Sequence, residues 1–596
     1  MPDDGPPYQD PAFPPNVPDG FEGDASVPAF HGPPPVFVSA SHPDAVPISG
    51  GTLLIAADGH TAVAADPDRD SVFVGDVDSV APLATIALRA GDEPGRLVED
   101  GARRVHVALR RGGAIVTIDL ATRAIIARRD ACPAPRGLAY DAAADTILVA
   151  CATGELVTFP AAGGAATRTV SLGRDLRDVV VSGNELLVSR FRSGDILHVD
   201  ATGAVTRTET LASVEMPAGG IGGGLKDLDT MTPSVAWRMI PRADGGAFVV
   251  HQRGRTSMLA TTPGGYGGMD GCGGAIHGAI TVVGGSFATQ TPAISDAVLP
   301  VDIAVSPDGQ TLVVIAAGNA HTPGAPTVLK IAAASGQSGP CTFAEGVAVG
   351  GQPVAAAFTK NGRLVVQSRE PAQLLVLPDG ATPVAFVPTP SAASIEDTGH
   401  AVFHSNSGSS LACASCHPEA GDDGRAWRFP FGARRTPSLR GTVAGTAPYH
   451  WNGDEHDIAQ LSHDVFSGRM AGPELDPPAV SSLQTWLYGI TAPPAAKVDA
   501  AAAARGLALF SSSDVGCASC HSGDKKTNNA TVDVGTGGAF QVPSLVGVGG
   551  RAPLMHDGCA ATLADRFGAC ATKGHGVTAQ LSPAQIGDLV TYLESL

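Results

Sequence analysis

The sequence predicts a multidomain fold of β and α structure, in which a seven-bladed β-propeller is followed by two tandem all-α domains. Three patterns in the 596 residues support this prediction. Seven short apolar runs recur through the first two thirds, a cysteine–histidine motif occurs twice in the last third, and a segment rich in Pro, Gly and Asp precedes both. The expected boundaries are 1–44 for the leader, 45–390 for the propeller, and 391–496 and 497–596 for the two C-terminal domains.

The composition argues against two classes of protein. Asp and Glu number 58 against 39 Lys and Arg, so the formal net charge is −19, whereas a nucleic-acid binder needs a basic surface. No run of about 18 apolar residues occurs, so we expect no membrane-spanning helix. The 74 Gly and 47 Pro indicate many turns between short strands.

The leader, 1–44, is rich in Pro and Gly. Its first part, Met1–Asp24, has neither the basic nor the apolar region of an export signal, and we expect it to be extended or disordered. The region 45–390 contains the seven apolar runs, several of them followed after a turn by a second strand. Units of roughly 40–50 residues with several strands are typical of β-propellers. The runs are Ser71–Gly75, Arg104–Ala108, Thr146–Ala150, Glu185–Ser189, Ala247–His251, Thr311–Ile315 and Arg363–Gln367.

Two hairpin turns are expected at matching points of two blades, at Asp308-Gly309 and at Asn361-Gly362. The segment Ser306–Val314 (SPDGQTLVV) resembles the seven-bladed propellers of the YVTN/lactonase-like type. A pair of β-sandwiches is the alternative, and the seven units favour the propeller. Because the blades of a propeller pack on one another, we expect 45–390 to fold without the C-terminal domains.

Three arginines recur at intervals of about 40 residues, each just before an apolar strand: Arg96, Arg136 and Arg177. They either line the central channel or cap strand ends and bridge blades, and we expect the second arrangement. The Gly-rich stretch 218–224 lacks the strand–helix context of a phosphate site and is expected to be a loop. With the irregular insert 262–274, it is placed to cover or recognise a partner on one propeller face.

The cysteine motif in the last third is Cys-x-x-Cys-His, the sequence that attaches haem c. Two thiols bond to one haem, and the adjacent histidine binds its iron. A redox dithiol or half a zinc site is the alternative, but zinc needs further ligands at short spacing, and two identical copies favour haem. We therefore expect two covalently bound haem c (iron) groups in two tandem all-α cytochrome c domains. The residues are Cys413, Cys416 and His417 in the first motif, and Cys517, Cys520 and His521 in the second.

The flanks of the two motifs also repeat, which indicates a tandem duplication with a helix at each end of each unit. The matching segments are Gly399–Phe403 with Gly506–Phe510, Thr436–Gly441 with Val542–Gly547, Ala447–Gly453 with Ala552–Gly558, and Leu483–Ile490 with Leu589–Leu596.

Several of these segments resemble the bacterial di-haem cytochrome c peroxidases and their MauG-type relatives. They read PSLRG, APYHWNG, APLMHDG and, at the end, YLESL, and the resemblance covers the last third of the chain. In that family one haem is the peroxidatic site, the other relays electrons, and a tryptophan lies between them. Trp451 matches that tryptophan, so the resemblance implies a catalytic role for it; ordinary packing against a haem is the alternative.

The sixth ligand of each iron is expected at nearly equivalent places in the repeat. Met470 lies 16 residues before Trp486, and His575 lies 17 residues before the matching Tyr592. We expect Met470 on the first haem and His575 on the second. The alternatives are a buried Met470 that only packs and a His575 in a surface loop. The competing ligands are His450, His456 and His463 in the first unit, and Met555 and His556 in the second.

One position departs from the family. Its peroxidatic site has an acidic residue just before a Met-Gly, and here Arg469 stands at that place in Ser467–Gly472. An arginine cannot accept a proton near neutral pH. Electron transfer with the propeller as docking or scaffold domain is therefore the first assignment, and a peroxidase-like oxidoreductase acting on hydrogen peroxide or a partner protein is the alternative.

The other six cysteines are an even number, as expected for three disulfides in an oxidising compartment. Their proposed pairs are Cys132–Cys151, Cys272–Cys341 and Cys559–Cys570. With haem attachment, this predicts an exported protein of the periplasm or cell surface whose signal has been removed, with a lipid anchor possible in the precursor. The expected partner is a redox protein: a cytochrome, a cupredoxin or a dehydrogenase.

Overall fold

The computed structural model describes residues 33–596 apart from 218–227, 268–271, 273, 286–292, 334–340, 343, 379–384 and 389–392. Most of the expected leader, all of the expected Gly-rich loop 218–224 and part of the insert 262–274 lie outside the described residues. Residues 33–44 contain neither helix nor strand. They are tied to the C-terminal third, because the amide of Ala40 donates to Oγ1 of Thr398 at 2.9 Å and that of His42 to Asp397 at 2.8 Å.

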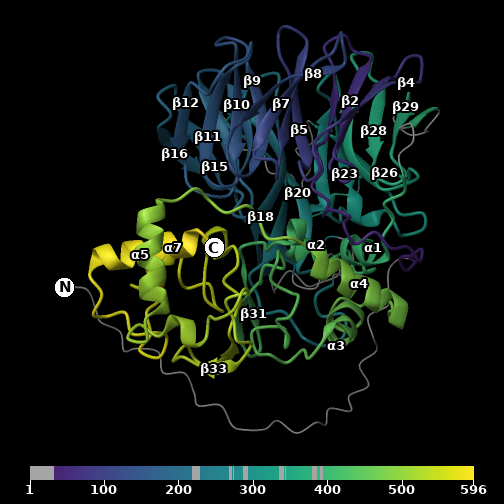
Figure 1. Cartoon of the computed structure of the whole chain (residues 1–596). Coiled ribbons are helices and arrows are strands. Elements are labelled where there is room, and N and C mark those ends of the chain that lie inside the picture. The colour runs from purple at the N-terminus through teal and green to yellow at the C-terminus, as the bar shows by residue number, and fades with distance from the viewer. Residues whose placement is uncertain are drawn as a thin grey trace.

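Seven β-sheets form the predicted propeller, and each of the seven apolar runs lies in a different sheet (Figure 1). Six sheets have four antiparallel strands, while the fifth has six and contains one parallel pair, β21 with β25. Both expected hairpin turns are found, since Asp308-Gly309 joins β22 to β23 and Asn361-Gly362 joins β27 to β28.

The strands of the first four sheets are β1 (Leu53–Ile55), β2 (Thr61–Asp66), β3 (Ser71–Asp76), β4 (Ala81–Ala87); β5 (Pro94–Glu99), β6 (Arg104–Leu109), β7 (Ala114–Asp119), β8 (Ala124–Asp130); β9 (Pro135–Asp141), β10 (Thr146–Cys151), β11 (Glu155–Pro160), β12 (Arg168–Ser171); β13 (Leu176–Ser182), β14 (Glu185–Arg190), β15 (Ile196–Val199), β16 (Val205–Glu209). The other three contain β17 (Val214–Pro217), β18 (Leu228–Pro241), β19 (Ala247–Arg255), β20 (Ile276–Val283), β21 (Ala293–Ile294), β25 (Cys341–Thr342); β22 (Pro300–Val305), β23 (Thr311–Ala316), β24 (Val328–Ala332), β26 (Glu345–Val347); β27 (Pro353–Phe358), β28 (Leu364–Ser368), β29 (Gln373–Leu377), β30 (Ala385–Pro388).

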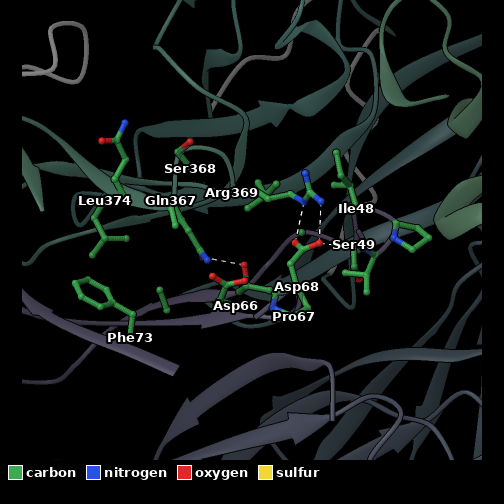
Figure 2. Close-up of a pocket in the computed structure, with 18 residues that line it drawn as sticks. Ile48, Ser49, Asp66, Pro67, Asp68, Phe73, Gln367, Ser368, Arg369 and Leu374 are labelled. Atoms are coloured by element: carbon green, nitrogen blue, oxygen red, sulfur yellow. Dashed lines mark hydrogen bonds and ion pairs between the residues drawn. The ribbon is translucent and has the colours of Figure 1, made fainter. Parts of the chain in front are cut away.

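The inner strands of the blades meet around a central channel in the order β1, β5, β9, β13, β18, β22 and β27. The ring closes where β27 contacts β1, so the first and last blades share a seam. Figure 2 shows part of this seam, where the guanidinium of Arg369 binds both carboxylate oxygens of Asp68 at 2.8 Å. At the same seam, Nε2 of Gln367 donates to the carbonyl of Ala65 at 2.8 Å.

Strands in the middle of a blade are apolar on both faces because neighbouring blades cover both sides. The last five residues of β6 and of β10 are buried without a break, and both strands are rich in β-branched residues. The outer strands β8 and β16 have mostly exposed or half-buried residues. This difference explains why the middle strands gave the clearest signal in the sequence.

Two units follow the propeller and lie beneath one of its faces: the first unit, 393–496, and the second unit, 497–596 (Figure 1). In each, the opening helix packs on the closing helix: α1 on α4 and α5 on α7. Within the described residues, no helix has the length and apolar character needed to cross a membrane. The helices are α1 (Thr398–His404), α2 (Cys413–Cys416), α3 (Ile458–Leu461), a π-helical segment (Ser462–Arg469) and α4 (Pro477–Gly489), then α5 (Ala500–Ser511), α6 (Leu563–Arg566) and α7 (Pro583–Glu594).

The sequence predicted two all-α units, and this prediction is wrong. Each contains a two-stranded antiparallel sheet, β31 (Ala426–Phe429) with β32 (Gly432–Arg435), and β33 (Thr531–Asp533) with β34 (Ala539–Gln541). Both hairpins end just before the repeated Pro-Ser-Leu segment, so they belong to the duplication. They were missed because strands of three or four residues have too few positions to show an alternating pattern.

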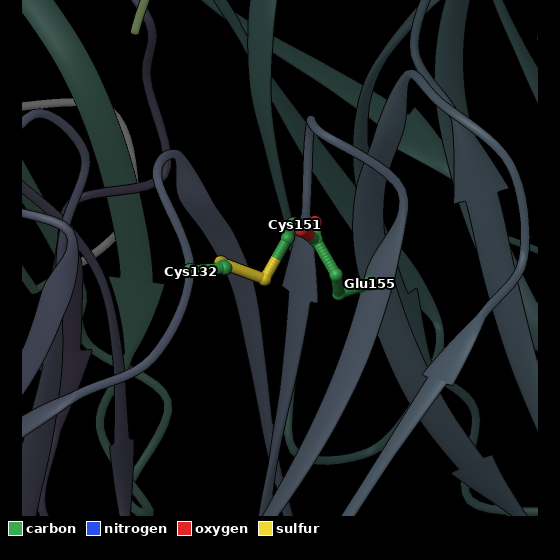
Figure 3. Close-up of side chains that lie close together, drawn as sticks. All are labelled: Cys132, Cys151 and Glu155. Atoms are coloured by element: carbon green, nitrogen blue, oxygen red, sulfur yellow. A yellow bond between two sulfur atoms is a disulfide. The ribbon is translucent and has the colours of Figure 1, made fainter. Parts of the chain in front are cut away.

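Three disulfides join the pairs proposed from the sequence: Cys132–Cys151, Cys272–Cys341 and Cys559–Cys570. Figure 3 shows the first of them, with Glu155 beside it. Both sulfurs of that pair are bonded to each other, so neither is a thiolate that could bind a metal ion with Glu155.

The hydrophobic core does not stop at the end of the propeller. One cluster of buried side chains contains Trp237 and Val314 from the blades together with Phe403, Met470 and Trp486 from the first unit. Polar contacts cross the same boundary, since Nε1 of Trp486 donates to the carbonyl of Ala45 at 2.8 Å. The blades therefore close partly on the first unit and not only on one another.

This shared core changes the expectation for an isolated propeller. A fragment of residues 45–390 would expose the side of the cluster around Trp237, so we expect it to unfold at a lower temperature than a fragment ending at 496. Calorimetric scans of the two fragments, both without the second unit, make the comparison. Equal unfolding temperatures would mean that the first unit contributes nothing to the propeller.

Candidate haem sites and their junction with the propeller

The two motif histidines are held in the same way. Nδ1 of His417 donates to the carbonyl of Gly421 at 3.3 Å, and Nδ1 of His521 donates to that of Lys526 at 3.0 Å. The carbonyls of Pro437 and Pro543, from the repeated Pro-Ser-Leu segments, face the same two rings. Each ring therefore has Nε2 available for a metal, which is the arrangement of a histidine ligand oriented by a backbone carbonyl.

Both imidazoles are neutral near pH 7, as metal binding requires. Burial lowers the pKa of His417 to about 4 and also lowers that of His521. Four of the ten cysteines lie outside disulfides, and they are the four of the two motifs. Two free thiols and one oriented, neutral imidazole at each motif fit haem c.

The first motif is also held by the propeller. Nε2 of Gln252, on β19, donates to the carbonyl of Ser415 at 2.8 Å, and Oε1 of Gln252 accepts from Nε1 of Trp237 at 2.7 Å. Ser415 lies between Cys413 and Cys416. Buried side chains of the fifth blade thus fix the turn that carries both thiols.

In the second unit, His575 faces His521, with ring centres 6.1 Å apart and planes inclined by 32°. A metal bound between two imidazoles by bonds of about 2 Å separates the ring centres by roughly 6 Å. Nε of Arg566 donates to Nδ1 of His575 at 3.0 Å, so the proton of the neutral ring lies on Nε2 in this arrangement. Binding of a metal through Nε2 requires that proton to move to Nδ1 and Arg566 to turn away from it. Burial lowers the pKa of His575 to about 3. The spacing fits the predicted pair of axial ligands.

In the first unit, the contacts reduce the number of candidates for the sixth ligand of the first haem, but they do not test Met470 itself. Its side chain is buried in the cluster against which Cys413 and Cys416 pack. Of the competing histidines, His456 is exposed, and His463 is exposed and bound to Glu474 at 2.9 Å. Met470 as the sixth ligand of the first haem stays a prediction.

A polar group near Met470 was not recognised in the sequence. Glu455 is 1% exposed and lies 3.9 Å from Arg469 and 3.6 Å from Nδ1 of His450. Burial raises the pKa of its carboxyl group, and Oε2 has no hydrogen-bond partner among the described residues. Glu455 thus places a buried acid beside Arg469, which stands where the resembling family has its own acid.

The propeller insert that we expected to cover a partner instead covers this part of the first unit. The amides of Gly264 and Tyr266 donate to the carbonyls of Gly468 and Arg469 at 2.9 and 3.0 Å. Burial raises the pKa of the Tyr266 hydroxyl, while the charge of Arg469 and a hydrogen bond to it act in the opposite direction. The described part of the insert, residues 262–267, 272 and 274, therefore belongs to the wall of the first motif's surroundings.

The two units meet through equivalent residues of the repeat. Arg435 matches Gln541, and Trp451 matches His556. The amide of Arg435 donates to the carbonyl of His556, and the amide of Gln541 donates to that of Trp451 at 2.8 Å. The rings of Trp451 and His556 themselves lie edge to face, with centres 6.3 Å apart. Such reciprocal contacts are those of an approximate two-fold axis, which passes between Trp451 and His556.

The recurrent arginines line the channel, and the bridging of blades that we expected is found as well, since Nε of Arg177 donates to the carbonyl of Trp237 in the next blade at 3.3 Å. Arg136 and Arg177 both lie on inner strands and bind Glu419, two residues after His417. The N–O distances to the Glu419 carboxylate are 2.7 Å for Arg177, 3.3 Å for Arg136 and 3.7 Å for Arg110. Arg96 also bridges blades, through Asp178 at 2.9 Å.

Glu419 is 6% exposed and stays ionised because of these partners. Burial alone would raise the pKa of its carboxyl group, but the charges of Arg136, Arg177, Arg110 and Arg440 hold it well below its usual range. The hydroxyl of Ser49 also donates to it at 2.5 Å. A buried carboxylate from the first unit thus fills one end of the propeller channel.

One comparison with known proteins identifies a domain in the C-terminal third of the chain. The family model for cytochrome c matches residues 503–596, so the second unit contains a cytochrome c domain. No curated protein matches the chain. Among solved structures, the chain is similar to hydrazine synthase from Kuenenia stuttgartiensis, at 14% identity and TM-score 0.46 over 57% of this chain and 99% of the other. It is also similar to a streptogramin B lyase, at 11% identity and TM-score 0.37 over 54% and 91%.

Proposed function

We propose that the protein is an exported di-haem c-type cytochrome that transfers electrons, with the propeller as its docking and scaffold domain. The observation that carries this proposal is the match between the two motifs. The second lies in a cytochrome c domain, and the first repeats its free thiols, its neutral histidine and the carbonyls behind that histidine. Two haem c groups follow from this repetition.

A haem at each motif supplies one-electron chemistry between ferrous and ferric iron. The residues of the chain would hold and separate these groups. Cys413 and Cys416 anchor one haem and His417 ligates it, with Met470 as the proposed sixth ligand. Cys517, Cys520, His521 and His575 do the same in the second unit. Trp451 and His556 are in contact across the interface and lie between the two units.

Haem content tests the proposal directly. Protein made with a haem-attachment system should carry two covalent haems by mass spectrometry. Cys413→Ala with Cys416→Ala should remove one of them, and Cys517→Ala with Cys520→Ala, the matched variant, should remove the other. A protein that keeps two haems after either change, or starts with only one, would defeat the assignment.

Export to the periplasm or cell surface and a redox protein as partner are parts of the same proposal. The three disulfides support an oxidising compartment, where such bonds persist. The partner would be a cytochrome, a cupredoxin or a dehydrogenase that exchanges one electron at a time.

A peroxidase-like activity is the second candidate, and Glu455 is the observation that favours it. A buried carboxyl group with a raised pKa, next to an arginine, is a group that can take a proton and return it. Glu455 thus supplies an acid near the first motif. The resembling family has its acid at the position where this chain has Arg469. Peroxidase activity remains the alternative because the proposed Met470 ligand would close the first iron to peroxide.

Peroxide turnover separates the two candidates. For electron transfer alone, we expect the fully reduced and mixed-valence proteins to consume hydrogen peroxide at well below about one per second, the low end for enzymes. Glu455→Gln should then change nothing. Turnover of many per second in the unaltered protein, with a loss of roughly 100-fold or more in Glu455→Gln, would establish the peroxidase instead.

A further inference from the structure

A cleft lies where the propeller and both C-terminal units meet. It has a volume of ≈ 140 Å³, and six arginines line it: Arg136, Arg174, Arg177, Arg192, Arg440 and Arg551. We call it the arginine cleft. Its walls come from the inner strands β9 and β13, from the loop after His417 and from residues 547–551 of the second unit.

The side chains of the arginine cleft carry more positive than negative charge. Six guanidinium groups face four carboxylates, those of Asp175, Glu419, Asp422 and Glu594. Asp175 and Asp422 both bind Arg192, at 3.2 and 2.9 Å. The chain as a whole has a net charge of −19, so this excess is local and not a reflection of a basic protein.

One carboxylate serves three arginines of the cleft. Glu419 lies 2.7 Å from Arg177, 3.3 Å from Arg136 and 4.0 Å from Arg440. A carboxylate has two oxygens, which cannot form paired hydrogen bonds with three guanidinium groups at once. Part of the donor capacity of Arg136 and Arg440 is therefore left for another acceptor.

Two buried guanidinium atoms of the cleft have no hydrogen-bond partner among the described residues: Nη2 of Arg551 and Nε of Arg440. In the part of the chain that the structure describes, no carboxylate lies within ion-pair distance of Arg551. Its Nη1 donates to the carbonyl of Ser544 at 2.9 Å. Burial lowers the pKa of Arg136 and of Arg551 to about 9. Buried donors without acceptors are costly, and an anion would remove that cost if the two guanidinium groups turned towards the cleft.

We propose that the arginine cleft binds a small multivalent oxyanion, either an inorganic one such as phosphate or sulfate, or a short dicarboxylate. Arginine is the side chain best suited to such groups, because its planar fork can donate two parallel hydrogen bonds to two oxygens. Bound there, the anion would contact the propeller and both units together. It would therefore stabilise their arrangement, by a free energy that grows with the logarithm of its concentration relative to its dissociation constant.

The test uses the full, haem-loaded chain. At constant ionic strength, phosphate, sulfate and succinate are compared with chloride by calorimetric titration and by the unfolding temperature. At least one multivalent anion should bind and raise that temperature, and chloride should not. Binding of phosphate and sulfate but not succinate identifies an inorganic oxyanion site, whereas the reverse identifies a dicarboxylate site.

Variants assign the binding to the cleft. Arg551→Gln and Arg136→Gln should each weaken binding about tenfold or more, the loss of a charge-assisted hydrogen bond. Arg551→Lys keeps the charge but not the fork, and should weaken binding even if Arg551→Gln does not fold. The matched control is Arg207→Gln, an arginine with a 53% exposed side chain on the propeller. Absence of specific binding to the unaltered protein, or equal affinity in all variants, overturns the proposal.

Discussion

Glu419→Ala should lower the free energy of unfolding by about 3–5 kcal/mol, the usual effect of removing one partner from a buried ion pair. The change leaves the guanidinium groups of Arg177 and Arg136 buried at the channel mouth without the carboxylate that neutralises them. Glu419→Gln keeps the volume and some hydrogen bonds but removes the charge, so we expect a smaller loss in the same direction. Denaturant unfolding followed by tryptophan fluorescence measures both.

The matched control is Glu345→Ala, which removes an ion pair with Lys330 from the propeller surface. The side chain of Glu345 is 72% exposed, so we expect a change of about 1 kcal/mol or less. If Glu419→Ala costs no more than this control, the charge at the channel mouth is not what joins the propeller to the first unit.

The blades could be predicted because their signal is local. A strand such as β10 is buried on both faces, so it reads as an unbroken apolar run wherever it lies in the chain. The haem motifs are local in the same sense, since five consecutive residues contain both thiols and the histidine. Neither prediction depended on which distant segments of the chain are in contact in the fold.

The role of the arginines could not be predicted in this way. Arg177 is separated by 242 residues from Glu419, its partner in the channel. In the sequence, Glu419 is an ordinary acidic residue after a haem motif, and its partners are fixed only when the first unit docks on the channel. Glu455, the acid beside Arg469, was missed for the same reason. It is separated from Arg469 in the sequence, and only the fold brings the two side chains together.

The repeat shows a third limit. Aligning the two units predicts that Trp451 and His556 are equivalent, but equivalence does not say that they touch. That contact arises from how one unit rotates onto the other, which the internal similarity of the repeat leaves open. A sequence argument could place Trp451 between two haems only by resemblance, whereas the structure places it between the units through its own contacts.

His575→Ala should convert the second haem from a six-coordinate to a five-coordinate, high-spin centre that binds carbon monoxide and cyanide. The imidazole of His575 lies opposite that of His521 at a distance that a shared metal would require. Its removal should also raise the reduction potential of this haem, since a nitrogen ligand that favours ferric iron is lost. Optical and EPR spectra of the oxidised and reduced protein report the spin state.

Met555→Ala is the matched control, because Met555 competes for the same role and would also bind iron. Met555 directly precedes His556 of the interface and packs against the same apolar cluster as Cys517. Of these two candidates, only His575 faces the ring of His521, so we expect the control to stay low-spin and closed to carbon monoxide. A second control, Cys559→Ser with Cys570→Ser, removes the disulfide that encloses α6 and Arg566 without touching His575. If Met555→Ala opens the iron while His575→Ala leaves it low-spin, the ligand is Met555, and the facing histidines in the second unit have another purpose.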